Sequence, residues 1–308
     1  MATRRDRSST ALRPLALSQG LLSRADGSAQ FSFGDVAVLG SVTGPAEVRI
    51  RDELVDRATL EINVRPLRGQ GGPGIKALEE TLASLFTPLI LLHLYPRALL
   101  QLTLQTVSSP STAFSIPTST DPLLQRKGKG KEEVVPTPRG VALGASERAA
   151  TINAAMMAVI DAGVQSRGML VAVAVAFVPR TKAADQEEEE EMVLDPSPAD
   201  EDQATSSHVF AFSFGVGVGG TQGTCVCVDS VGTFSEDQLF DAQDLAQSAC
   251  QTVLAFIRKS VETKYGAESG PAPVTTRPAA AADAEEEPMA DASEENESSD
   301  DDKVMIDA

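Results

Sequence analysis

The sequence predicts an α+β protein built from two similar halves. Residues 11–107 give strand-like segments, one helix and a further strand. From about residue 141 the chain gives a helix, a strand, a hairpin and a long amphipathic helix. Strands and helices distributed in this way are typical of the α+β class. With 308 residues and 42% hydrophobic content, the chain is long enough to bury a large core.

The strands of the first half are predicted from turn signals and apolar density. A hairpin is predicted over 21–44, with turn signals at 26–28 and 34–35, where glycine can take a positive φ. Residues 54–67 alternate as a strand, and 98–108 read as the next one.

Two helices are predicted near the middle of the chain. Apolar residues at helical spacing predict one over 75–94, and we expect Pro88 to bend or break it. The second is predicted over 146–163, with Ser146 as its N-cap and Gly163 as the residue that ends it.

The second half continues with strands and a long helix. The apolar run 169–178 predicts a strand that is buried on both faces. Residues 208–220 and 224–232 predict a hairpin. Residues 234–266 predict an amphipathic helix with Ser235 as its N-cap.

Four segments lie outside this pattern of elements. Residues 1–10 form a polar arm, and residues 180–191 form a charged, acidic loop. We expect the insertion 109–140 and the acidic tail 267–308 to be disordered, because neither can form a core. The rest of the span 11–266 is predicted to be one domain.

The net charge of −18 is unevenly distributed. Residues 283–308 carry 12 acids and one lysine, and residues 185–191 carry six acids. The rest of the chain has 26 acids and 25 bases, so the acidity of the whole does not exclude RNA as a partner. Trp is absent and Tyr occurs twice, which disfavours an aromatic platform for bases. Three cysteines without an apolar leader fit a reducing compartment.

Three patterns have a structural rather than a catalytic interpretation. The GxGxxG match at 215–220 precedes a strand, so a hairpin turn is favoured over a dinucleotide site. Cys225 and Cys227 are interpreted as buried thiols, because His93 and His208 are the only histidines that could complete a metal site. Neither histidine has a neighbouring Ser or Cys that suggests a catalytic triad, and we predict no metal and no cofactor.

Several motifs, in this order, resemble the RNase PH family. They are FSFGDVAVL (31–39), GPAE (44–47), TINAAMMAVIDAG (151–163), MVLDP (192–196) and GTFSEDQL (232–239). The resemblance implies a ribosomal protein S5 domain 2-like fold made of two βαβα-like halves. Members are phosphorolytic 3′→5′ exoribonucleases or catalytically silent ring subunits of the RNA exosome, and the Asn-Ala-Ala and Leu-Asp-Pro motifs look most similar to a eukaryotic ring subunit.

The resemblance places a phosphate site just before the central helix. Active members have Gly-Gly-Thr-Arg there, which supplies donors to inorganic phosphate. The matching residues are Ala145, Ser146, Glu147 and Arg148. Arg148 keeps the basic position, whereas Glu147 adds a negative charge. At ~4 Å and an effective dielectric of ~20, like charges repel by roughly 4 kcal/mol, which favours loss of phosphate binding.

The resemblance also places a catalytic carboxylate two residues after the aspartate of the Leu-Asp strand end. Asp195 is that aspartate, and the catalytic position falls on Ser197. A serine cannot act as a general acid at neutral pH. Asp200, Glu201 and Asp202 are close in sequence, and one of them could substitute.

Arginines of the first half are candidate RNA contacts, because phosphates require only positive charge. They are Arg49, Arg51, Arg57, Arg65 and Arg68. The alternative is a set of solvated strand edges paired with nearby acids. Residues 79–81 are Glu-Glu-Thr where the family has Arg-rich sequence, which weakens the RNA interpretation.

These departures favour a non-catalytic subunit of the exosome ring. The resemblance implies neighbouring RNase PH-like subunits, weak threading of single-stranded RNA, and roles in ribosomal RNA maturation and messenger RNA turnover in nucleus, nucleolus and cytoplasm. We expect no membrane and no small-molecule substrate. One alternative is an active phosphate-dependent exoribonuclease that uses Arg148 and Asp195, Asp200 or Asp202. Another is a binder of basic proteins through residues 283–308.

Overall fold

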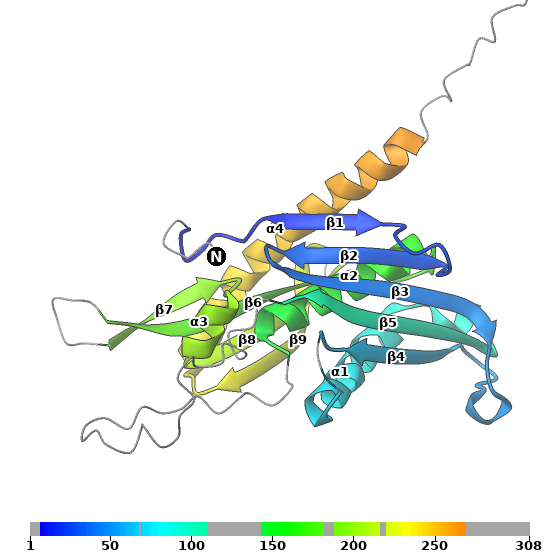
Figure 1. The fold of residues 1–308 in the computed structure, drawn as a ribbon, viewed down its shortest axis with the longest axis horizontal. Coiled ribbons are helices and arrows are strands. Elements are labelled where there is room, and N and C mark those ends of the chain that lie inside the picture. The colour runs from blue at the N-terminus through cyan, green and yellow to red at the C-terminus, as the bar shows by residue number, and fades with distance from the viewer. Residues whose placement is uncertain are drawn as a thin grey trace, which may run out of the picture. The chain divides into compact units, whose positions relative to one another are not determined.

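The computed structural model describes residues 7–67, 69, 71–109, 143–181, 188–215 and 220–268 (Figure 1). The predicted insertion, apart from Ser109, and the tail from 269 onward lie outside the described residues. Residues 1–267 form one compact unit. In the described part of the chain, no helix is long and apolar enough to cross a membrane.

The first half forms a five-stranded sheet in the order β1-β2-β3-β5-β4. Its strands are β1 (Leu15–Gln19), β2 (Gly27–Phe33), β3 (Val36–Glu47), β4 (Thr59–Arg65) and β5 (Ala98–Ser108). All neighbours are antiparallel except β4 and β5, which are parallel. Helix α1 (Pro73–Leu89) makes the crossover that a parallel pair needs, and it packs against β4.

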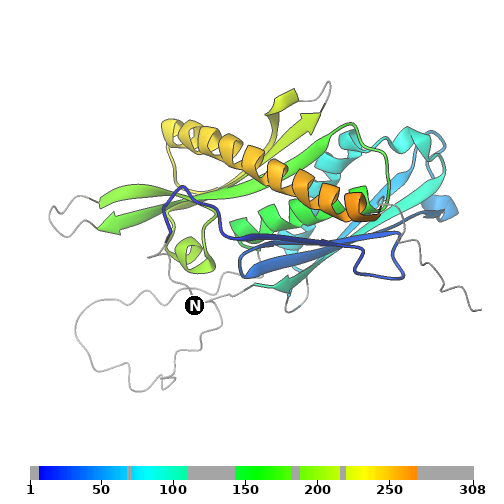
Figure 2. The ribbon, with the colours of Figure 1, turned by 90° about the horizontal axis from the view of Figure 1, so that it is seen from above.

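The second half forms a four-stranded antiparallel sheet in the order β7-β6-β8-β9. Its strands are β6 (Met169–Thr181), β7 (Glu188–Leu194), β8 (Ser206–Gly215) and β9 (Gly220–Gly232). The short helix α3 (Pro198–Gln203) joins β7 to β8. The long helix α4 (Glu236–Glu268) follows β9 and runs obliquely over this sheet (Figure 2).

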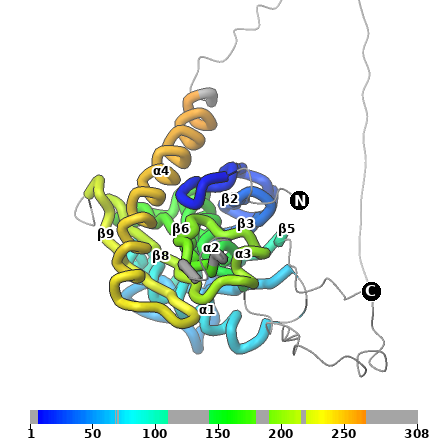
Figure 3. The backbone as a smooth tube through the Cα atoms, turned by 90° about the vertical axis from the view of Figure 1, so that its left-hand side faces the viewer, coloured from blue at the N-terminus to red at the C-terminus, as the bar shows by residue number. Residues whose placement is uncertain are grey.

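Helix α2 (Ala145–Asp161) lies between the two sheets. It contacts β2 and β3 on one side and β6 and β8 on the other (Figure 3). Because both sides are covered, it is buried over almost its whole length. Its buried Asn153 donates to the Ala172 carbonyl and accepts from the Ala172 N–H, both at 2.8 Å. The Asn153 side-chain amide therefore pairs with the backbone N–H and C=O of a β6 residue that β7 does not reach.

Glycines let the first sheet approach α2 closely. A Cβ on Gly27 would lie 2.2 Å from the Ala162 nitrogen, and a Cβ on Gly40 would lie 2.8 Å from the Ala154 oxygen. Backbone atoms cannot move aside as a flexible side chain can. The two glycines therefore pack directly against the alanines along α2, with no room for a larger side chain.

Most predicted elements are confirmed. The strand over 98–108 has the predicted limits, and the apolar run 169–178 lies in β6 with residues 170–177 buried. Residues 206–215 and 220–232 pair as the β8–β9 hairpin, and a strand follows the GxGxxG match, whose residues 216–219 lie outside the described residues. Ser235 begins α4 as predicted: its Oγ accepts from the Gln238 N–H (3.3 Å), and the Gln238 side chain accepts from the Ser235 N–H (2.8 Å).

Three boundaries in the first half and at α2 were predicted wrongly. The opening hairpin joins β2 and β3 around Gly34, whereas residues 26–28 lead into β2, because the strand before them is β1. Helix α1 ends at Leu89, one residue after Pro88, and residues 92–94 form a separate 3-10 turn. Ser146 is not the N-cap of α2, since Gly144 occupies that position.

The predicted acidic loop over 180–191 was also wrong in part. Thr181 pairs with Glu188, and the ladder continues to Glu191, so these residues extend the β6–β7 hairpin. Because β7 lies at the border of its sheet, a side chain on it can reach solvent, as that of Glu190 does. Residues 182–187 lie outside the described residues.

The glycine contact gives a stability prediction. Gly40→Ala places a methyl group against the Ala154 oxygen and the Ala158 side chain, so we expect it to lower the free energy of unfolding by about 1–3 kcal/mol. Gly266→Ala is the matched control, because nothing lies within 4 Å of a Cβ there. Urea unfolding followed by circular dichroism measures both. Equal stability of the two variants would contradict this account of the packing.

Candidate functional site

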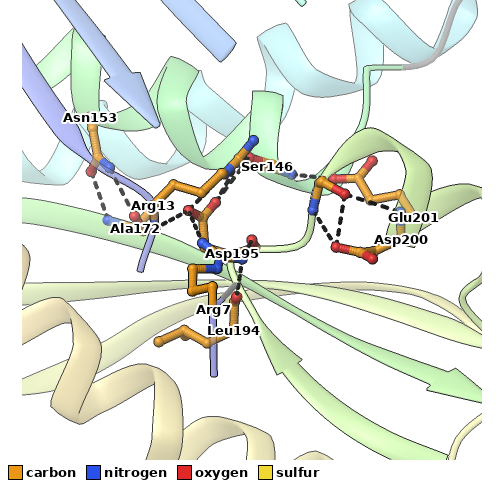
Figure 4. Close-up of polar contacts among 10 residues, drawn as sticks. Arg7, Arg13, Ser146, Asn153, Ala172, Leu194, Asp195, Asp200 and Glu201 are labelled. Atoms are coloured by element: carbon orange, nitrogen blue, oxygen red, sulfur yellow. Dashed lines mark hydrogen bonds and ion pairs between the residues drawn. The ribbon is translucent and has the colours of Figure 1, made fainter. Parts of the chain in front are cut away.

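A buried ionic network joins the N-terminal arm to the end of β7 (Figure 4). Its centre is Asp195, which is 1% exposed and follows β7. Arg13 donates to the Asp195 carboxylate from its backbone N (2.9 Å), Nε (2.8 Å) and Nη2 (2.5 Å). Arg7 Nη2 donates to the Asp195 carbonyl oxygen (2.8 Å). Arg7 of the arm and Arg13, which precedes β1, therefore hold one aspartate.

The first turn of α2 belongs to the same network. Ser146 Oγ donates to Asp195 Oδ1 (3.2 Å) and accepts a short contact from Arg13 Nη2. Ser146 N donates to Glu201 Oε1 at 2.8 Å. A Cβ on Gly144 would lie 2.2 Å from Glu201 Oε2, so the N-cap must be glycine for this carboxylate to approach. The start of a helix is an anion site, and here an internal carboxylate occupies it.

Glu201 is positioned by the short helix α3. The Ser197 side chain caps this helix, and its Oγ donates to Asp200 Oδ2 (2.8 Å), which also accepts from the Ser197 N–H (2.9 Å). This capping box orients the first turn of α3, which carries Glu201. The predicted acid residues Ser197 and Asp200 are therefore engaged in a helix cap, and Asp202 is exposed.

Arg148 lies on α2 beside a cleft of about 390 Å³. Residues of α1, of the start of α2 and of the β8 and β9 ends line the cleft. Arg148 Nη1 makes a short ion pair with Asp229 of β9, and the Arg148 side chain is 13% exposed. Arg148 Nε is buried and has no hydrogen-bond partner among the described residues. Asp229 therefore compensates the charge of the only basic residue that lines the described cleft.

Glu147 is buried beside these groups, at 8% exposure. Burial raises the pKa of its carboxyl above the ordinary 4.5, and hydrogen bonds with Thr106, Ser109 and Gly144 oppose that rise in pKa. Ser109 Oγ donates to Glu147 Oε2 at 3.2 Å. The structure thus brings Ser146, Glu147 and Arg148 onto one turn, but each is bonded to a different part of the protein.

The candidate RNA arginines do not form a single patch. Arg49 and Arg51 are exposed at the 3-10 turn Ile50–Asp52, between β3 and β4, and Arg57 is exposed in the same connection. Arg65 is exposed at the other end of β4, roughly 20 Å along the strand. Arg51 lies 3.4 Å from Asp52, the pairing that the alternative interpretation predicted. Arg68 lies outside the described residues.

His208 has neighbours that sequence reasoning missed. It is fully buried, with Nε2 3.1 Å from Ser206 Oγ and Nδ1 2.7 Å from Ser230 Oγ. The rings of Phe177 and Phe234 pack edge-on against it. Burial lowers the pKa of His208. The prediction that it lacks a serine neighbour was wrong, because Ser206 lies two residues earlier on β8 and strand pairing places Ser230 of β9 opposite His208.

The thiols are structural residues. Cys225 and Cys227 are half-buried, Cys250 is buried, and all three are free. Burial raises the pKa of each thiol above its ordinary value, which lowers its reactivity. In the part of the chain that the structure describes, no group of three or more His, Cys, Asp or Glu side chains could hold a metal ion.

Sequence reasoning identified no role for Arg7, Arg13 or Asp229. Arg13 and Asp195 are 182 positions apart, and Arg148 and Asp229 are 81 positions apart. Only the fold brings these charges together. Glu201 was named as a possible acid, but its place at the start of α2 was not predicted.

Comparisons with known proteins define the family. The profile of the RNase PH family, "3' exoribonuclease family, domain 1", matches residues 11–165. "Exosome complex component RRP46" of Saccharomyces cerevisiae is 32% identical over 249 residues, which cover 79% of this chain and 93% of that protein. "Exosome complex component rrp46" of Schizosaccharomyces pombe is 36% identical over 93 residues, 30% of this chain and 41% of that protein.

A solved structure shows the same fold. The crystal structure of rice (Oryza sativa) Rrp46 has a TM-score of 0.63 and 23% identity, and it covers 83% of this chain and 98% of the rice chain. The chain belongs to the RNase PH family, as its motifs and their order predicted. The predicted α+β, RNase PH-like fold is confirmed.

Burial of Glu147 gives a pH-dependent prediction. Because the folded-state pKa of Glu147 is raised above 4.5, ionisation costs stability as the pH rises above that value. We expect Glu147→Gln to melt at a higher temperature than the parent at pH 7, with the difference disappearing towards pH 4. Thermal unfolding across this range measures it. Glu80→Gln, at an exposed position of α1, is the control and should show no such trend.

Proposed function

We propose that this chain is a non-catalytic subunit of an RNA exosome ring. The names of its yeast relatives and its membership of the RNase PH family support the exosome assignment. Its work would be structural: it would pair with neighbouring RNase PH-like subunits and support 3′→5′ processing by a separate nuclease. We further propose roles in ribosomal RNA maturation and messenger RNA turnover, in nucleus, nucleolus and cytoplasm.

One observation carries the non-catalytic part of the proposal: carboxylates already occupy the donors that phosphate would need. Ser146 N donates to Glu201 Oε1 (2.8 Å), and Arg148 is paired with Asp229. An entering phosphate would have to displace both carboxylates and would lie beside Glu147. Each like charge at ~4 Å opposes it by roughly 4 kcal/mol at an effective dielectric of ~20.

Asp195 is poorly placed to be the acid of phosphorolysis. Arg13 engages both of its carboxylate oxygens, and Ser146 Oγ donates to Oδ1. A general acid must reach the leaving oxygen of the substrate directly or through one water. Proton transfer from Asp195 would therefore require this buried network to open.

The active-exoribonuclease alternative has one observation in its favour. Arg148 Nε is buried beside the cleft and has no hydrogen-bond partner among the described residues. A phosphate oxygen in the cleft could accept from this N–H. The alternative then needs Asp229 to give up its pair with Arg148.

A phosphate-dependence assay separates the two functions. End-labelled single-stranded RNA is incubated with the purified full chain, with and without millimolar phosphate, and resolved on a gel. We expect no phosphate-dependent shortening. If RNA shortens only when phosphate is present, the chain is an enzyme and the non-catalytic proposal is wrong.

Phosphate binding tests the physical reason for inactivity. Glu201→Gln with Asp229→Asn removes the two carboxylate charges, so we expect measurable phosphate binding by calorimetry where the parent shows none. Asp202→Asn, at an exposed position of α3, is the control and should behave as the parent. Binding of equal strength by parent and double variant would contradict the explanation.

The ring role is tested separately by coexpression with other RNase PH-like subunits and native mass spectrometry. We expect a hetero-oligomer that contains one copy of this chain. A stable homo-oligomer that excludes the other subunits would contradict the ring proposal.

A further inference from the structure

The connection from β7 to α3 carries a Ser-Pro dipeptide, Ser197-Pro198, in extended backbone. Ser197 has φ −73° and ψ 160°, and the proline that follows has no N–H to donate. One class of protein kinase selects a serine or threonine by the proline that follows it, and kinases bind their substrates as extended chain. Both side chains are half-buried and Ala199 is exposed, whereas Pro196 is buried, so the dipeptide is open from the α3 side.

A second such dipeptide, Thr87-Pro88, lies in a different setting. Both of its residues are in α1, and Thr87 Oγ1 donates to the Ala83 carbonyl oxygen at 2.6 Å. A kinase could bind this segment as extended chain only if α1 unwound, and α1 buries six apolar side chains. Helix α3 has six residues, of which Glu201 alone is buried. Opening α3 therefore disturbs far less packing than opening α1.

The Ser197 hydroxyl helps to hold α3 in place. Its Oγ donates to Asp200 Oδ2 (2.8 Å) and accepts from the Asp200 N–H (3.3 Å). In the next residue, Glu201 N donates to the Ser197 carbonyl oxygen (2.9 Å), and Glu201 Oε1 accepts from Ser146 N (2.8 Å; Figure 4). A change at the Ser197 hydroxyl is therefore transmitted through α3 to the first turn of α2.

A phosphoryl group on Ser197 Oγ is incompatible with this capping arrangement. It replaces the hydroxyl proton that Asp200 accepts, and it adds a charge of about −1.5 to −2 at neutral pH. Three carboxylates lie in the six residues of α3: Asp200, Glu201 and Asp202. The start of a helix attracts an anion with the equivalent of at most about half a positive charge. Repulsion from the carboxylates therefore exceeds this attraction, and the phosphoryl group displaces α3.

We propose that Ser197 is the phosphorylation site of a proline-directed kinase, and that its phosphorylation withdraws Glu201 from Ser146 N. In this reaction the bond between Ser197 Oγ and the γ-phosphorus of ATP forms, and the bond from that phosphorus to the β–γ bridging oxygen breaks. ADP leaves, and the hydroxyl proton passes to a base of the kinase. Residues 144 and 145 line the cleft, so the Ser146 N–H then faces solvent. The inference rests on the proposed function only in that Glu201 is one of the carboxylates argued to exclude phosphate.

Phosphorylation of the full chain tests the site. The purified protein is incubated with a recombinant proline-directed kinase and ATP, and the modified residues are mapped by mass spectrometry. We expect modification at Ser197 and none at Thr87. Pro198→Ala keeps the serine and places a good helix former at the start of α3, and it should abolish modification of Ser197. If the kinase modifies a synthetic peptide of residues 191–203 but not Ser197 of the full chain, the proposal is overturned.

Amide hydrogen exchange tests the structural consequence. In the phosphorylated chain we expect the Ser146 amide to exchange at least about tenfold faster, because Glu201 no longer accepts from it. The Ala172 amide, which donates to Asn153 at 2.8 Å, is the internal control and should keep its rate. Unchanged exchange at Ser146 in fully modified protein, or equal acceleration at Ala172, would overturn the proposal. This result is independent of the RNA assay, so failure of the proposed function and failure of the switch at Ser197 are distinguishable.

Discussion

The buried first turn of α2 is the constraint on which the rest of the structure depends. A helix begins with backbone N–H groups that have no partner within the helix, and in α2 residues 145–147 of this end are buried. Partners must therefore come from the protein or from a ligand. Glu201 supplies one at Ser146 N, and Gly144 is the residue that leaves room for it.

The surrounding charges follow from that requirement. Asp195 accepts from Ser146 Oγ of this first turn, and Arg13 and Arg7 compensate the charge of its carboxylate. Removing one partner from a buried ion pair leaves an uncompensated charge, which is strongly destabilising. The arm, α3 and the end of β7 are thus held at the start of α2. At the position where the family resemblance predicts phosphate, side chains from α3, from the end of β7 and from β9 bond to the first turn of α2.

The sequence predicted the parts of the fold that depend on local pattern. The strand at 98–108 was predicted from the spacing of its apolar residues, and the helix that Ser235 begins was predicted from its capping residues. Both signals lie within a few neighbouring residues of the sequence. Ser146 was mistaken for an N-cap, because the capping rule weighs the side chain and does not register that Glu201 needs a glycine at 144. The acidic run at 188–191 was mistaken for loop, because composition alone does not show that an edge strand can face water.

The candidate site was predictable only as a set of positions. The resemblance identified Ser146, Glu147, Arg148 and Asp195, whereas their partners Arg13, Asp229 and Glu201 come from distant or unrelated parts of the sequence. Charge pairing between strand, helix and arm is set by topology, and no spacing rule within one segment shows it. Which groups bond to Ser146, Arg148 and Asp195 therefore depends on contacts that only the folded chain makes.

The most direct test of this account is a crystal structure of the parent chain soaked in phosphate. We predict that Ser146 N remains bonded to Glu201 and Arg148 to Asp229, with no phosphate between them. Phosphate bound to Ser146 N and Arg148, with Glu201 or Asp229 turned away, would contradict the claim that the protein's own carboxylates fill this site.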